Sequence, residues 1–190
     1  MKKIKIKNFY ISNEDKLVLI AGPCVIENKK HTIKMAEEIF NICNESNINF
    51  IFKSSFDKAN RSSIKSNRGV SIEEGIEIFT EIKSLYDCSI ITDIHNVDQC
   101  KEISKSNIID IIQIPAFLCR QTDLLIAAGE TNKIINVKKG QFLSPHEMLN
   151  VIEKIHTTKN NKIMLTERGT SFGYNNLIND FKSIDIMKNF

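Results

Sequence analysis

The sequence contains no apolar stretch that approaches the roughly 20 residues of a membrane-spanning helix. Its first residues, Met1–Lys5, also lack the apolar run of a signal peptide. The excess of positive charge is slight, with 26 basic against 23 acidic residues and a formal net charge of +3. Because nucleic acids and anionic membranes select strongly basic surfaces, we expect neither as a partner.

The cysteine count excludes a disulfide framework. There are five cysteines, an odd number, and no C-x-x-C pair. This usage is typical of a reduced, cytoplasmic protein. The 190 residues are 42% hydrophobic and 26% charged, which is ordinary globular composition and enough for one sizeable core. We therefore expect a single domain over residues 1–190.

Short apolar runs rich in isoleucine and valine alternate with amphipathic stretches. The runs are continuous, as expected for parallel strands that helices cover on both faces. The predicted strands are residues 17–21, 49–52, 89–92, 109–114, 133–137 and 163–166. The predicted helices are residues 30–45, 71–86, 97–105, 122–129 and 144–156, two of which open with a capping-box pattern. Residues 3–6 and 9–11 are predicted to form a small hairpin.

Six strand-then-helix units fit either a TIM-type (β/α) barrel or an open doubly wound sheet. Polar residues follow nearly every predicted strand, among them Lys53, Asp93, Lys138 and Arg168. In a barrel these positions meet on one face, whereas an open sheet gathers its chemistry at one switch point. The distribution therefore favours a barrel. A closed barrel has eight units, so six predict an incomplete one.

The loop at residues 52–63 is the strongest local signal for binding. It places Lys53, Lys58 and Arg61 among serines and an asparagine. Such donors suit a phosphate, since charge-assisted hydrogen bonds to oxyanions are strong, although a solvated basic loop has the same composition. Gln113 lies inside an apolar run and needs a partner, either a neighbouring loop backbone or a ligand. Taken alone, the adjacent Lys138 and Lys139 indicate a solvated pair. Arg168 beside Glu167 likewise indicates only a local salt bridge.

Six longer motifs resemble the 3-deoxy-manno-octulosonate 8-phosphate (Kdo-8-phosphate) synthase family over about residues 17–187. They are LVLIAGPCVIE (17–27), FKSSFDKANRSS (52–63), TDIH (92–95), QIPAFLCRQTD (113–123), NVKKGQF (136–142) and TERGTSFGYNN (166–176). The related heptulosonate 7-phosphate synthase of the shikimate pathway shares the Gly-Pro-Cys start. It has Lys-Pro-Arg-Thr where this chain has Lys58-Ala-Asn-Arg61, so the loop favours the Kdo-8-phosphate branch.

The resemblance implies a TIM-barrel transferase, a cytoplasmic homotetramer in lipopolysaccharide (Kdo) biosynthesis. Members condense phosphoenolpyruvate with D-arabinose 5-phosphate and release phosphate. Two phosphorylated substrates explain the ring of lysine and arginine after the strands.

Carried over by position, the resemblance implies catalytic roles for Lys58, Asn60 and Asp93. Phosphoenolpyruvate would be bound by Lys53, Ser55, Lys58, Gln113, the Ala116 backbone, Lys138 and Arg168. Arabinose 5-phosphate would be bound by Asn60, Arg61 and Ser62, with Arg120 reaching its phosphate from a neighbouring subunit.

Within the family that the sequence resembles, a cysteine at the position of Cys24 is typical of the metal-dependent class. Members of that class bind zinc, iron or manganese. Their other ligands, a histidine, a glutamate and an aspartate, follow the seventh and eighth strands. Because this sequence ends soon after the sixth predicted strand, we expect a C-terminally truncated chain with an incomplete metal site. His95 alone among four histidines follows a strand, and we do not expect it to replace the missing ligand. Two alternatives to an active synthase are a catalytically inactive remnant and a fragment that needs a complementing chain.

Overall fold

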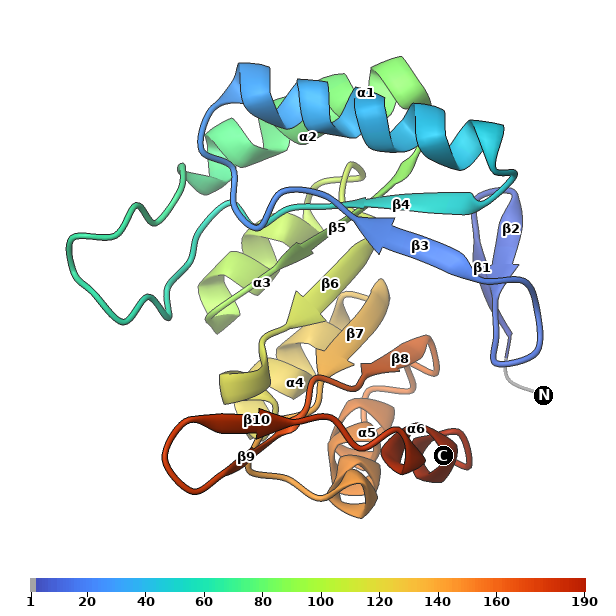
Figure 1. The fold of residues 1–190 in the computed structure, drawn as a ribbon, viewed down its shortest axis with the longest axis vertical. Helices are drawn as coiled ribbons and strands as arrows, with labels where there is room; N and C mark the ends of the chain where they lie inside the picture. The colour runs from blue at the N-terminus through green and yellow to red at the C-terminus, as the bar shows by residue number, and fades with distance from the viewer. Residues whose placement is uncertain (1–2) are drawn as a thin grey trace. The chain divides into compact units, whose positions relative to one another are not determined.

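The computed structural model describes residues 3–190 (Figure 1). Its strands are β1 (Ile4–Ile6), β2 (Phe9–Ile11), β3 (Val18–Ala21), β4 (Asn49–Lys53), β5 (Ser89–Asp93), β6 (Ile111–Ile114), β7 (Ile134–Lys138), β8 (Ile163–Thr166), β9 (Thr170–Phe172) and β10 (Asn176–Ile178). Its α-helices are α1 (Lys29–Glu45), α2 (Ile72–Tyr86), α3 (Val97–Ser104), α4 (Thr122–Glu130), α5 (Met148–His156) and α6 (Lys182–Met187). Two short 3₁₀ helices are η1 (Ala116–Leu118) and η2 (Pro145–Glu147).

The main sheet has six strands in the order β3-β4-β5-β6-β7-β8. The pairs β3–β4, β4–β5 and β7–β8 are parallel. Strand order follows chain order throughout, without the reversal that defines a doubly wound sheet. This is the topology of a TIM-type (β/α) barrel with six of its eight units, and it confirms the predicted fold class. The predicted N-terminal hairpin is also present, as the antiparallel pair β1–β2.

The chain divides into two compact units. The first runs to Asp93 and includes Lys105–Ile111, and the second comprises Ile94–Ser104 with Ile112–Phe190. The prediction of one domain over residues 1–190 stays a prediction, and the units are described separately below.

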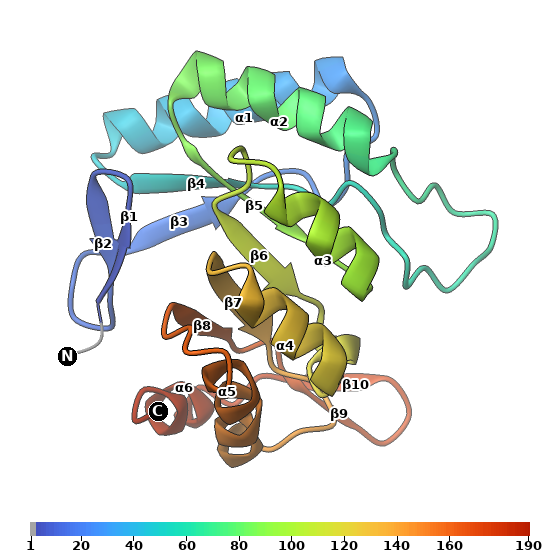
Figure 2. The same ribbon diagram turned by 180° about the vertical axis from the view of Figure 1, so that it is seen from behind.

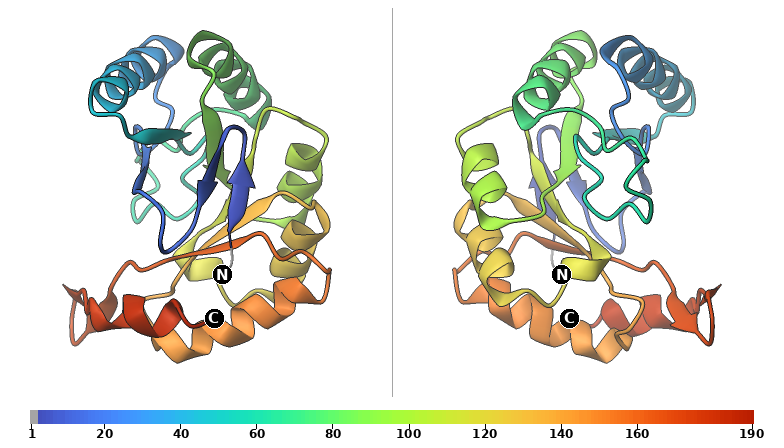
Figure 3. Two further views of the ribbon diagram at one scale, coloured as in Figure 1. Left: turned by 90° about the vertical axis from the view of Figure 1, so that its right-hand side faces the viewer. Right: turned by 90° about the vertical axis from the view of Figure 1, so that its left-hand side faces the viewer.

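In the first unit, α1 and α2 lie side by side (Figure 3) and pack on β4 and β5, respectively. Ser71 caps α2 by accepting a hydrogen bond from the Glu74 N–H at 3.2 Å. The core includes Phe52, Phe79 and Ile82, each at most 1% exposed. Burying side chains of this size contributes about 1.5–3 kcal/mol each, which holds the strands in place.

In the second unit, helices α3, α4 and α5 follow one another along the sheet, each packed on the next (Figure 2). The predicted capping box at Ser144 and Glu147 is present, with Pro145 in the first turn. This capping box lies at the start of η2, and α5 begins directly after η2, at Met148. The hairpin β9–β10 and helix α6 follow β8; neither was predicted, and every residue of the two hairpin strands is exposed.

None of the helices described within residues 3–190 combines the length and apolarity needed to cross a membrane.

Candidate active site

In the first unit, the segment after β3 is held tightly against the end of β4. A Cβ on Gly22 would overlap the carbonyl oxygen of Lys53 and lie 2.9 Å from its carbonyl carbon. The Ser54 hydroxyl donates to the Pro23 carbonyl at 3.0 Å. Val25 also forms a parallel β-bridge outside the named strands. The Gly-Pro-Cys segment therefore fixes the backbone from which Lys53 projects.

Lys53 and Ser55 form a compact pair of donors. The Lys53 ammonium lies 3.1 Å from the Ser55 hydroxyl and 3.4 Å from the Cys24 carbonyl oxygen. Ser55 is fully buried, whereas Lys53 is half-buried. An ammonium and a hydroxyl that are held together suit an oxyanion such as phosphate. Cys24 contributes its backbone to this arrangement.

Lys58 and Asp93 also come together in the first unit. Lys58 Nζ lies 4.0 Å from Asp93 Oδ2, and the two side chains are only 16% and 6% exposed. A carboxylate this buried requires charge or hydrogen-bond partners. Asp93 is the last residue of β5, so the pairing keeps the Lys58 ammonium beside the end of that strand.

The loop beyond Lys58 extends away from the helices and strands of the first unit (Figure 1). Its base is closed by the Lys58 N–H, which donates to the Arg68 carbonyl at 2.7 Å. Just beyond this base, Asn60, Arg61 and Ser62 are exposed. The Arg61 guanidinium donates to the Asn67 carbonyl of the same loop at 3.3 Å. These three residues are thus solvated, in contrast to Lys53, Ser55 and Asp93.

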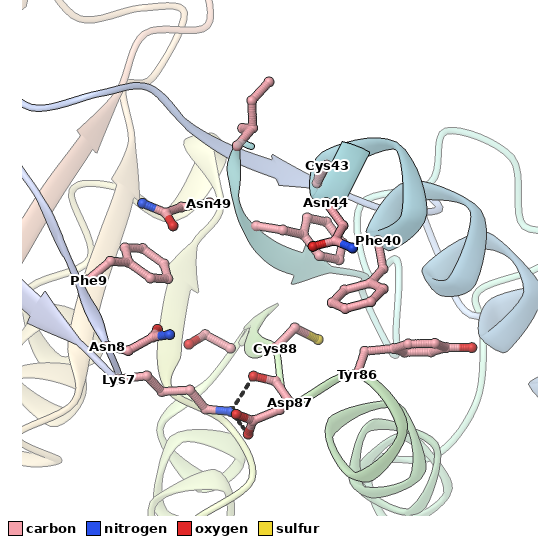
Figure 4. A pocket seen from close by; sticks show the side chains of 13 residues that line it. Lys7, Asn8, Phe9, Phe40, Cys43, Asn44, Asn49, Tyr86, Asp87 and Cys88 are labelled. Atoms are coloured by element: carbon pink, nitrogen blue, oxygen red, sulfur yellow. Dashed lines mark hydrogen bonds and ion pairs between the residues drawn. The ribbon is translucent and has the colours of Figure 1, made fainter. Parts of the chain in front are cut away.

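A pocket of about 270 Å³ lies at the opposite end of the strands of this unit (Figure 4). Its lining includes Asn8 in the β1–β2 turn, Asn49 at the start of β4 and Asp87 after α2. The Lys7 ammonium donates to the Asp87 carboxylate and carbonyl, both at 2.7 Å. This hydrogen bond and the charge of Lys7 lower the pKa of Asp87. The pocket contains none of the predicted site residues, because those follow strands and the pocket lies where strands begin.

In the second unit, the register of β7 with β8 aligns two predicted cations. Lys138, the last residue of β7, pairs with Thr166, the last residue of β8. Arg168 follows two residues later and is partly buried. Because parallel strands end at one edge of a sheet, Lys138 and Arg168 lie at the same end of this unit. This is the carboxyl end, where barrel enzymes carry their active sites.

The structure contradicts two simpler interpretations of this region, a solvated lysine pair and a local salt bridge. Lys139 is 1% exposed, so it does not form a solvated pair with Lys138. Glu167 does not pair with Arg168: its carboxylate lies 3.6 Å from Lys139 Nζ and accepts the Ser183 hydroxyl at 2.5 Å. Sequence spacing gave no signal for the burial of Lys139, because two adjacent lysines after a strand are usually solvated.

A chain of polar side chains crosses β6, β7 and β8. Gln113 Oε1 accepts from Asn136 Nδ2 at 3.3 Å, and Asn136 Oδ1 accepts from the Thr166 hydroxyl at 2.8 Å. Gln113 thus finds a side-chain partner on the next strand rather than a loop backbone. Asn136 was missed as a candidate, although it interrupts an apolar run just as Gln113 does. The same signal would have identified it.

Two further predicted positions follow β6 in the second unit. Ala116 is buried and begins η1 after β6, where a first-turn N–H has no acceptor within the helix. Arg120 is exposed, and its carbonyl accepts from Lys154 at 3.0 Å. His95, which was not expected to act as a metal ligand, precedes α3, and its backbone N–H donates to the Gln99 side chain at 2.8 Å.

The described residues do not form a metal centre. Cys24 is exposed, and residues 3–190 contain no group of three or more His, Cys, Asp or Glu side chains able to hold a metal ion. All five cysteines are free thiols. Burial raises the pKa of Cys88 and of Cys100 to about 11, so neither is a thiolate at neutral pH. A single exposed thiol does not match the four-ligand sites typical of zinc.

Comparison with known proteins gives one consistent result. The profile of the DAHP synthetase I family matches residues 2–190. The chain is 54% identical over 188 residues to the 2-dehydro-3-deoxyphosphooctonate aldolase of Rickettsia prowazekii, covering 98% of this chain and 68% of the relative. It is 50% identical over 190 residues to the protein of that name from Fusobacterium nucleatum (100% and 68%) and 49% identical over 187 residues to that from Bartonella henselae (98% and 66%). The chain thus spans about two thirds of the length of these relatives.

Proposed function

The chain belongs to the DAHP synthetase I family, and on that premise we propose that it acts in the Kdo-8-phosphate synthase reaction. The reaction condenses phosphoenolpyruvate with D-arabinose 5-phosphate and water to give 3-deoxy-D-manno-octulosonate 8-phosphate and phosphate. The observation that carries the proposal is the shared name of relatives at 49–54% identity over 98–100% of the chain. That name favours this reaction over the heptulosonate reaction of the shikimate pathway.

The cations at the strand ends support a role in holding phosphoenolpyruvate. We assign its phosphate to Lys53 with Ser55 and to Lys138 with Arg168. Lys58 takes the carboxylate side, while Gln113 and the Ala116 N–H supply further polar contacts. A substrate with a phosphate and a carboxylate demands several fixed donors, and charged donors to oxyanions form the stronger hydrogen bonds.

The exposed residues of this loop are assigned to the second substrate. Asn60, Arg61 and Ser62 would hold arabinose 5-phosphate, and exposure leaves them accessible to it. Arg120 would reach the sugar phosphate of a neighbouring subunit, which implies a homo-oligomer, a tetramer in this family. We place the protein in the cytoplasm, as the family resemblance implies.

The chemistry proposed is a carbon–carbon bond formation. C3 of phosphoenolpyruvate attacks the aldehyde carbon of the sugar, whose oxygen takes a proton, while water adds at C2. Loss of inorganic phosphate from C2 then leaves the new keto group. Lys58, oriented by Asp93, and the phosphate-binding cations stabilise the charge that develops, since fixed charges in a partly buried site need little reorganisation. Asn60 is assigned to positioning the aldehyde.

Membership of the metal-dependent class would place zinc, iron or manganese at Cys24. The described residues do not fit a complete metal site, so no step above depends on one. The lack of a three-ligand group within residues 3–190 favours a second candidate function, binding of phosphoenolpyruvate without turnover by this chain alone. Turnover would then require a complementing chain.

The test measures phosphate release by the purified chain given phosphoenolpyruvate, arabinose 5-phosphate and Mn²⁺, with and without EDTA. Release that EDTA abolishes supports a metal-dependent synthase. Calorimetric titration with phosphoenolpyruvate then compares wild type with Lys138→Ala and Arg168→Ala, using Lys101→Met as an exposed control on α3. Binding without release supports the second candidate, and unchanged binding in both variants contradicts the phosphate assignment.

A further inference from the structure

Lys139 is among the largest fully buried side chains of the protein, at 1% exposure. Lysine is almost never buried to this extent unless it is paired. Its ammonium lies within reach of the Gly140, Leu143 and Gly169 carbonyls, the Thr170 hydroxyl and the Glu167 carboxylate, at 3.4, 3.2, 3.2, 3.3 and 3.6 Å. A buried charge with this many acceptors fixes their positions as much as its own.

The acceptors belong to two different loops. Gly140 and Leu143 follow β7, whereas Glu167, Gly169 and Thr170 follow β8. The backbones of the two segments are joined as well, because the Lys139 N–H donates to the Thr166 carbonyl at 2.9 Å. Lys139 therefore ties together the two loops that leave the carboxyl ends of β7 and β8.

Glu167 extends this connection. Its Oε1 accepts the Gly169 N–H at 2.6 Å, and its Oε2 accepts the Ser183 hydroxyl of α6 at 2.5 Å. Arg168 lies between Glu167 and Gly169 in the chain, so both of its neighbours are anchored. Lys138 directly precedes Lys139. Successive residues of an extended chain point to opposite sides, so Lys139 can be buried while Lys138 faces the other way.

We propose that Lys139, through Glu167, is a positioning residue that holds Lys138 and Arg168 in place for an oxyanion. This inference rests on the proposed function, because it assigns those two cations to the phosphate of phosphoenolpyruvate. Lys139 is too buried to contact the substrate. Its role is to remove the loop motion that binding would otherwise have to stop, which is the general advantage of a preorganised site.

The experiment is a calorimetric titration of folded variants with phosphoenolpyruvate, with inorganic phosphate as a second probe. Lys139→Met keeps an unbranched side chain of similar length and removes its charge and donors. Lys101→Met makes the same change at an exposed position of the second unit. We expect Lys139→Met to weaken phosphoenolpyruvate binding at least tenfold and Lys101→Met to leave it unchanged.

A double-mutant cycle separates positioning from general loss of structure. In a Lys138→Ala/Arg168→Ala background, Lys139→Met should weaken the remaining binding by less than threefold, because both cations that it positions are already gone. An equal tenfold loss in both backgrounds would overturn the proposal. If Lys139→Met does not fold, Lys139→Met/Glu167→Gln takes its place in the cycle, since replacing both members of a buried pair is better tolerated than replacing one.

The outcomes distinguish this inference from the function on which it rests. A wild-type chain that binds no phosphoenolpyruvate refutes the proposed function, and this inference with it. A wild-type chain that binds, together with a folded Lys139→Met variant of equal affinity, refutes the positioning role alone.

Discussion

Replacing Gly22 by alanine is expected to disturb the substrate-binding end of the first unit. The added Cβ would overlap the Lys53 carbonyl oxygen and approach its carbonyl carbon to 2.9 Å and a Phe52 ring carbon to 3.1 Å. Two of these three atoms belong to the backbone of β4, so no side-chain rotation can relieve the overlap. The chain after β3 must instead move away from Lys53.

The size of the effect follows from that displacement. Overpacking of a well-packed region costs about 1–3 kcal/mol of folding free energy. Clearing the overlap requires a shift on the order of 1 Å, and a misplacement of that size can cost about 100-fold in function. We therefore expect Gly22→Ala to lower the free energy of unfolding by about 1–3 kcal/mol and to weaken phosphoenolpyruvate binding by roughly 10- to 100-fold.

Gly173→Ala supplies the matched control. Gly173 has φ +56° and nothing within 4 Å of an added Cβ. Alanine there should cost about 1–2 kcal/mol through backbone strain alone and leave binding unchanged. Denaturant unfolding and calorimetry measure both quantities. A Gly22→Ala variant with wild-type stability and wild-type affinity would refute the close approach of the two segments.

Two further predictions concern the first unit. Lys7→Met should reduce stability at neutral pH and flatten its decline in acid, as urea unfolding from pH 7 to pH 3 would reveal. The Lys7 hydrogen bond and charge lower the pKa of Asp87 below its ordinary 3.8, so the stabilisation is present above that value and is lost as the pH falls through the lowered pKa; an unchanged acid limb would contradict the pairing. Cys24 should be the first thiol alkylated by iodoacetamide in the native protein, read by mass spectrometry, because it alone is exposed and burial raises the pKa of the other four. Simultaneous labelling of a second cysteine would contradict this.

The six strands were predicted from their continuous apolar runs, and all six are present. Three of them extend by one residue onto a polar side chain: Lys53, Asp93 and Lys138. The hydrogen bonds between parallel strands are formed by the backbone and do not depend on the side chain. The end of a strand is therefore not marked by the end of an apolar run. β6 begins later than predicted, at Ile111. Asp110, just before it, accepts hydrogen bonds from the Ile90 N–H and the Lys83 ammonium, each at 2.8 Å.

The last elements could not have been predicted from periodicity. Hairpin β9–β10 buries no residue, and Phe172 remains 69% exposed. Its strands therefore carry none of the alternation that a half-buried strand shows. Helix α6 has only six residues, and its buried positions include Ser183, which a hydrophobic pattern does not reveal.

The sequence by itself determined the (β/α) repeat, the strand ends at which polar residues gather, and, through its long motifs, the family resemblance. These are local properties, because burial on both faces of a parallel strand and the capping of helices are written into neighbouring residues. Only the tertiary structure decided which polar residues are partners: Lys58 with Asp93, Gln113 with Asn136, and Lys139 with Glu167. Each pair is separated by more than 20 positions in the chain, and burial of a charge depends on acceptors that folding alone brings together.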